Sequence, residues 1–82
     1  MDYIEKEYDE DVDAAYFRFS YNKVAETVEL DEPGLEDYII DLDEAGEVIG
    51  LEVLNYSDHA EALGEGPDVW NHLNDYPGFH LH

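Results

Sequence analysis

Apolar and polar residues alternate through most of residues 1–55, and this period of two constrains the fold more than any other feature of the chain. Successive side chains of a β-strand point to opposite faces, so such alternation predicts strands that turn one face toward a core. Phe17 and Phe19, for example, alternate with Tyr16 and Arg18. Strands are therefore expected at residues 14–19, 24–30, 37–43 and 48–54, with a shorter one near residues 3–7.

The segment 48–54 is apolar on nearly both faces, which is typical of a strand that has neighbours on either side, so we expect it at the centre of the sheet. Tyr21-Asn22-Lys23 predicts a tight link between two strands. Asp43 to Gly46 predicts a hairpin loop with Gly46 in the left-handed conformation. Since parallel strands need long crossovers, these short links favour an antiparallel meander of four to five strands.

Helical signals replace the alternation in the C-terminal part of the chain. Asp58 and Glu61 have the spacing of a capping box, and Gly64 would end a short helix. Pro67 suits the first turn of a second helical segment, on which Trp70 is the expected anchor.

Together these patterns predict an α+β fold, in which short C-terminal helical segments follow the antiparallel meander. A chain of 82 residues forms one domain, here residues 1–82. We expect residues 1–55 to form the sheet. Because a single sheet leaves one apolar face to be covered, residues 56–82 are expected to pack on it or on a partner subunit.

The charge of the chain limits its partners. There are 23 Asp and Glu residues against 3 Lys and Arg, which gives a net charge of −20. Nucleic acid and anionic membranes are bound through Lys and Arg, so neither is expected as a partner. The N-terminus is acidic and no stretch approaches about 18 apolar residues, so we expect no signal peptide, no membrane span and a cytoplasmic location.

The acidic residues are spread over the whole chain and do not form one block. In a salt-rich cytoplasm, multimolar salt shortens the Debye length to about 3 Å and removes the self-repulsion. A basic partner protein is the alternative explanation, because it would complement the charge. The even spread favours adaptation to salt.

One acidic spacing is that of a calcium-binding loop. Asp41, Asp43, Gly46 and Glu52 fall at the first, third, sixth and twelfth positions of an EF-hand loop. Ala45, at the fifth position, has no side-chain oxygen, and the flanks have the pattern of strands instead of helices. We therefore expect a hairpin and no metal site, and Asp41, Asp43 and Glu52 are the only metal-ligand candidates.

No pattern singles out a catalytic or cofactor-binding residue, so none is expected. The histidines lack the spacing of a metal site, and acidic pairs are too common in this chain for one pair to indicate a catalytic dyad. The histidines are His59, His72, His80 and His82.

Three stretches resemble domain of unknown function 2283, a family of small prokaryotic proteins. They are residues 8–20, which include Ala15-Tyr16-Phe17-Arg18, residues 24–29 and residues 41–54. The resemblance implies a small β-rich fold without established activity or catalytic residues. It also implies an antitoxin-like role, since some members are thought to act beside toxins.

The favoured function is therefore non-enzymatic, by protein–protein contact in a high-salt cytoplasm. The first alternative is an antitoxin-like neutraliser of a basic partner protein. The second is a small enzyme with a site on the acidic sheet face. A homodimer through an apolar sheet face or the C-terminal segment is a further expectation.

Overall fold

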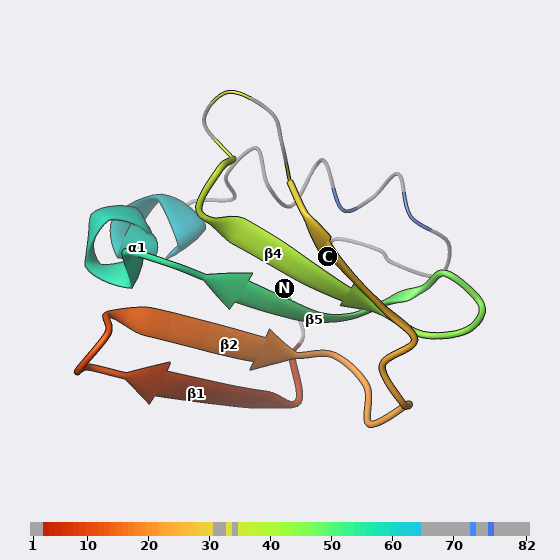
Figure 1. Cartoon of the computed structure of the whole chain (residues 1–82). Helices are drawn as coiled ribbons and strands as arrows, with labels where there is room; N and C mark the ends of the chain where they lie inside the picture. Colours follow the sequence, from red (N-terminus) through yellow and green to blue (C-terminus); the bar gives the residue numbers. More distant parts are fainter. Residues whose placement is uncertain (1–2, 31–32, 34, 65–72, 74–75, 77–82) are drawn as a thin grey trace.

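The computed structural model contains a sheet of five antiparallel strands in the order β1-β2-β5-β4-β3 (Figure 1). The structure describes residues 3–30, 33, 35–64, 73 and 76. The expected α+β class, with antiparallel strands followed by a short helix, is confirmed. The elements are β1 Glu5–Asp9, β2 Ala14–Arg18, β3 Glu26–Glu29, β4 Tyr38–Leu42, β5 Val48–Val53 and α1 Tyr56–Gly64.

The central strand is β5, as its apolar sequence predicts. It pairs with β2 along one side and with β4 along the other. Leu51 and Val53 are 0% exposed on one face, and Gly50 is buried on the other. A strand buried on both faces gains most from having a neighbour on each side.

The strand order is sequential only within β1-β2 and within β3-β4-β5. Because β5 takes the place beside β2, the chain passes from β2 to the far edge of the sheet before β3 begins. The segment Tyr21-Asn22-Lys23 links two strands as expected, but β2 and β3 are not neighbours in the sheet, so the expected meander was wrong at this point. Backbone hydrogen bonds hold both ends of this connection, from Phe19 N to Ile49 O at 2.9 Å and from Ala25 N to Leu42 O at 2.8 Å.

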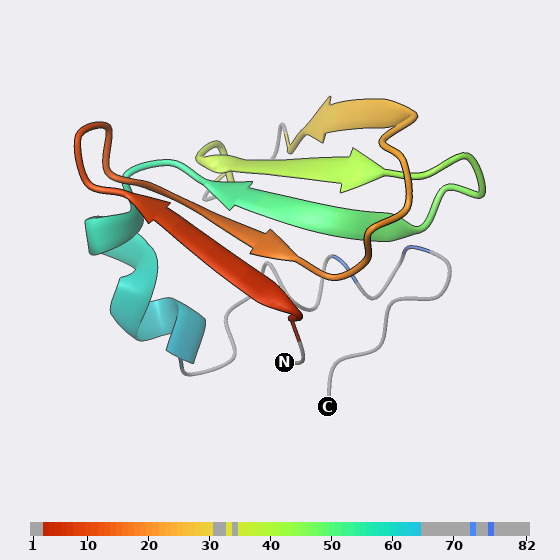
Figure 2. The same cartoon turned by 90° about the horizontal axis from the view of Figure 1, so that it is seen from below.

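One face of the sheet carries the hydrophobic core, and α1 lies at one end of the sheet on that side (Figure 2). Full burial of an aliphatic side chain such as Ile40 stabilises the fold by about 1.5–3 kcal/mol. Tyr56 of α1 packs against the core cluster. The buried members of the cluster are Ala15, Phe17, Leu30, Leu35, Tyr38, Ile40, Leu42, Val48, Leu51, Val53 and Leu73.

Leu73 is the buried residue of this cluster that comes from the C-terminal part of the chain, and Tyr76 packs beside the cluster. Leu73 is 0% exposed. The rest of the expected second helical segment, including Pro67 and Trp70, lies outside the described residues.

The helix α1 begins earlier than its sequence predicts. It starts at Tyr56, so Asp58 lies in its first turn, where the amide of Asp58 donates to the carbonyl oxygen of Asn55 at 3.0 Å. The expectation that Asp58 caps the helix was wrong. Asn55 turns the chain from β5 into α1 with a φ of 51°. The helix ends at Gly64, as expected.

The hairpin loop between β4 and β5 has the predicted conformation. Gly46 has a φ of 79°, which places it in the left-handed region that glycine favours. Its amide donates to the carbonyl oxygen of Asp43 at 3.0 Å. The Asp43 amide in turn donates to the carbonyl oxygen of Glu47 at 3.0 Å, which closes the loop.

The packing of side chains on the face of the sheet opposite the core depends on Gly50. The ring of Tyr16 lies over this glycine, and a Cβ atom at position 50 would overlap the Tyr16 hydroxyl group. Tyr16 can therefore cross β5 only because residue 50 has no side chain.

We predict that Gly50→Ala lowers the free energy of unfolding by about 1–3 kcal/mol, the usual cost of overpacking. In a Tyr16→Ala background the same change should be neutral or stabilising by up to about 1 kcal/mol, because alanine loses less backbone entropy than glycine in a strand. Urea denaturation followed by circular dichroism at one KCl concentration measures both values. An equal loss in the two backgrounds would contradict the overlap.

Candidate functional site: the open face of the sheet

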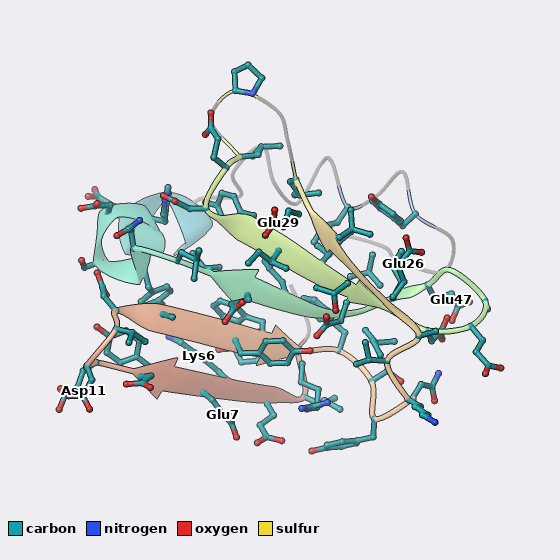
Figure 3. All side chains as sticks on the ribbon, viewed as in Figure 1. Lys6, Glu7, Asp11, Glu26, Glu29 and Glu47 are labelled. Carbon is teal, nitrogen blue, oxygen red and sulfur yellow. The ribbon has the colours of Figure 1, made fainter. Side chains whose placement is uncertain are left out.

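The candidate site is the face of the sheet turned away from the core, here called the open face. Among the described residues its side chains alternate with those of the core, as the strand register requires. Figure 3 shows Glu7 and Glu29 on strands near its two edges. Its residues are Glu5, Glu7, Asp9, Ala14, Tyr16, Arg18, Thr27, Glu29, Ile39, Asp41, Gly50 and Glu52.

Asp41 occupies the middle of a hydrogen-bonded group on the open face. The Tyr16 hydroxyl crosses β5 and donates to Asp41 Oδ2 at 2.7 Å, while Thr27 Oγ1 donates to Asp41 Oδ1 at 2.7 Å. Burial, followed by the hydrogen bond to Asp41, holds the pKa of Tyr16 well above its usual range. The carboxylate therefore binds two neutral hydroxyl groups instead of a cation.

Arg18 extends this group toward β1. Its guanidinium group lies 5.3 Å from the Tyr16 ring centroid and 5.5 Å from that of Tyr21. Arg18 Nε is 3.9 Å from Glu5 Oε2, and the Tyr21 hydroxyl donates to the same oxygen at 3.1 Å. The hydrogen bond to Glu5 raises the pKa of Tyr21. We call Glu5, Arg18, Tyr16, Asp41 and Thr27 the transverse network.

The calcium-like spacing does not bring its three candidates together. Asp41 is engaged in the transverse network, whereas Asp43 folds back on its own hairpin. Asp43 Oδ1 accepts from the amides of Ala45 and Glu47 at 2.9 and 3.0 Å. The Glu47 amide contributes most to lowering the pKa of Asp43. Among the residues that the structure describes, no three or more His, Asp or Glu side chains are grouped to hold a metal ion.

A second carboxylate, Asp13, joins the loop between β1 and β2 to the start of α1. Asp13 Oδ2 accepts from Ser57 Oγ at 2.5 Å, and Asp13 Oδ1 accepts from the Ser57 amide at 3.1 Å. The Tyr8 hydroxyl donates to Asp13 Oδ1 at 2.9 Å, and the Tyr56 amide donates to the Asp13 carbonyl oxygen at 2.8 Å. The bonds to the carboxylate from the Ser57 hydroxyl, the Tyr8 hydroxyl and the Ser57 amide, in that order of size, lower the pKa of Asp13.

His59 is the histidine that the structure describes, and its role is structural. Its Nε2 lies 2.9 Å from Asp37 Oδ2, and its ring centroid is 5.1 Å from that of Tyr38. Asn55 Nδ2 donates to the other oxygen of Asp37 at 3.2 Å. These contacts tie α1 to the residue that precedes β4.

The Lys6 ammonium group makes cation–π contacts with aromatic rings on the core face. Its Nζ lies 4.7 Å from the Tyr56 ring centroid and 5.6 Å from that of Phe17. It also donates to the Tyr56 hydroxyl at 2.7 Å. Lys6 therefore supports the packing of α1 and neutralises little of the open face.

A hollow of about 660 Å³ lies on the open face above the β1–β2 hairpin. Ala14 is among the small residues of its floor, and Tyr16 forms a wall. Glu7, Asp9 and Glu52 line it with carboxylates. It is a surface depression with an apolar floor and an acidic rim.

These features define a class: a small α+β protein with a five-stranded antiparallel sheet, the helix α1 after the last strand and an acidic open face. The chain belongs to the DUF2283 family, described as proteins of unknown function, whose family model matches residues 6–57. The match covers more than half of the chain and confirms the resemblance seen in the sequence. Neither a curated protein nor a solved structure matches the chain.

Among the described residues, no helix has the length and apolar character needed to cross a membrane.

Asp13→Asn tests the link between the β1–β2 loop and α1. A carboxylate whose pKa is lowered in the folded state adds stability above its unfolded pKa, and this stability is lost as the pH falls through the folded value. The native protein should therefore unfold at higher urea concentration than the variant at pH 7. The difference should shrink as the pH falls below the ordinary Asp value of 3.8.

The control for this experiment is Asp11→Asn, which makes the same charge change in the same loop. The Asp11 side chain is exposed, and its backbone amide donates to Asp9 Oδ1 at 3.0 Å. The Asp11→Asn change should therefore lower the free energy of unfolding only slightly. A pH-independent difference between the native protein and Asp13→Asn would contradict the assigned role.

Proposed function

We propose that this chain is a non-enzymatic protein that acts by protein–protein contact in a salt-rich cytoplasm. The observation that carries the proposal is how the carboxylates are held. Asp13, Asp41 and Asp43 all accept hydrogen bonds from neutral hydroxyl, amide or carboxamide groups. The ion pairs within 4.0 Å between described residues include Arg18–Glu5 and, when His59 is protonated, His59–Asp37.

Neutral donors suit a salt-rich solvent for a physical reason. Exposed ion pairs are screened by salt, whereas a short hydrogen bond from a hydroxyl or amide depends much less on the ionic atmosphere. Three tyrosines serve as such donors: Tyr8 to Asp13, Tyr16 to Asp41 and Tyr21 to Glu5. The remaining repulsion between carboxylates is long-ranged, and multimolar salt reduces the Debye length to about 3 Å.

A non-enzymatic role is supported by the lowered pKa values of two hydrogen-bonded carboxyl groups. A general acid needs a carboxyl group whose pKa is raised toward neutrality. Hydrogen bonds lower the pKa values of the Asp13 and Asp43 carboxyl groups, away from neutrality. The central polar groups of the open face, Tyr16, Asp41 and Thr27, are bonded to one another. This arrangement suits a stable surface better than proton transfer.

A basic partner protein is the second candidate, and the acidic hollow favours it. Antitoxin-like neutralisation of a basic protein would use the same kind of contact. A homodimer through the open face is less favourable, because it would bring the carboxylates of two copies together. The expected dimer contacts, an apolar sheet face or the C-terminal segment, stay predictions.

The folding of the protein as a function of KCl concentration tests this proposal. We predict unfolding below about 1 M KCl and refolding above it, since the Debye length shrinks with added salt. Circular dichroism follows folding, and light scattering on the same samples gives the mass. Complete folding in dilute buffer would overturn the high-salt part of the proposal.

A charge variant separates screening from other effects of salt. Changing four exposed side chains, Glu10, Glu26, Glu29 and Glu44, to Gln should move the folding midpoint to a lower KCl concentration. The matched control changes the same four residues to Asp and keeps the charge. Equal midpoints for the Gln and Asp variants would contradict a mechanism based on repulsion.

A further inference from the structure

The hollow above the β1–β2 hairpin owes its shape to two side chains. Ala14 is small, so it leaves space beside its cross-strand partner Asp9. Tyr16 leans away across Gly50 to reach Asp41. The result is an apolar floor open to solvent between β1 and β5.

Two carboxylates that line the hollow, Glu7 and Glu52, differ from the hydrogen-bonded carboxylates described above. Asp13, Asp41 and Asp43 are each held by at least two hydrogen-bond donors. Glu7 and Glu52 lie on opposite sides of Tyr16 in the strand register, and their carboxylates have no hydrogen bond or ion pair with a described side chain. Their charges are available to a ligand, whereas those of Asp13, Asp41 and Asp43 are already engaged.

We propose that this hollow binds a lysine or arginine side chain from an extended basic segment of a partner protein. The apolar stem of such a side chain would lie on Ala14 and against the Tyr16 ring, and its cationic head would meet Glu7 and Glu52. The apolar stem needs a hydrophobic floor and the cationic head needs an acidic rim, and this hollow has both. The inference rests on the proposed function by protein–protein contact and adds the place and the partner chemistry.

The hollow explains how such contact can persist in salt. Coulomb attraction between exposed groups weakens as the ionic strength rises. Burial of the apolar stem does not depend on that attraction. A shaped hollow therefore retains selectivity for lysine or arginine where a flat acidic surface would not.

Binding of a fluorescein-labelled octalysine peptide tests the inference by fluorescence anisotropy. The salt concentration is one at which circular dichroism shows every variant folded. Glu7→Gln with Glu52→Gln should weaken binding about threefold, a modest factor because salt screening weakens each exposed ion pair. The matched control, Glu26→Gln with Glu29→Gln on β3, removes the same charge at the other edge of the sheet and should weaken binding about twofold or less.

A second variant, Ala14→Leu, fills the hollow without changing the charge. It should weaken binding at least as much as the Glu7 and Glu52 pair does. Equal weakening by the two Gln pairs would overturn the inference, because it would indicate attraction by net charge alone. Native affinity in Ala14→Leu, or no peptide binding by the native protein, would also overturn it.

The folding and mass measurements that test the proposed function are independent of these affinities. A protein that needs salt to fold but binds octalysine without regard to the hollow would retain the proposed function and lose the inference. If Ala14→Leu does not fold, the comparison of the two Gln pairs decides the matter.

Discussion

The structure depends on hydrogen bonds that uncharged hydroxyl and amide groups donate to its carboxylates. The chain has 23 acidic residues and only 3 lysines and arginines, so ion pairing could satisfy few of them. The fold instead directs hydroxyl and amide donors at carboxylates that connect separate elements. Asp13 ties the β1–β2 loop to α1 in this way, and Asp41 ties β2 to β3 and β4. The tyrosine-rich composition is explained in part by this role.

The same constraint accounts for the arrangement of the sheet. β5 buries Leu51 and Val53 in the core and has Gly50 on the open face, where Tyr16 can cross to Asp41. A larger residue at position 50 would block that crossing. The open face is therefore organised by a contact between strands that are not neighbours, β2 and β4, over the strand between them. Glu7 and Glu52 lie outside this network, at the hollow beside β1.

Local pattern predicted the local structure well. The period of two gave the strands, the apolar pattern of 48–54 gave the central strand, and Gly46 gave the hairpin loop. The place of β3 could not be predicted, because pairing depends on long-range burial and the short Tyr21-Asn22-Lys23 link suggests a hairpin. The contact of Asp13 with Ser57 joins residues 44 apart in the sequence, and that of Tyr16 with Asp41 joins residues 25 apart. No local sequence motif predicts either of these two contacts.

The coupling between Tyr16 and Asp41 tests the account most directly. A double-mutant cycle with Tyr16→Phe and Asp41→Asn, measured by urea unfolding at two KCl concentrations at which all four proteins fold, gives their interaction free energy. If neutral donors hold the carboxylates, this free energy should agree at the two concentrations within about 0.5 kcal/mol. A coupling that falls toward zero at the higher concentration, as expected for an exposed ion pair, would contradict the account.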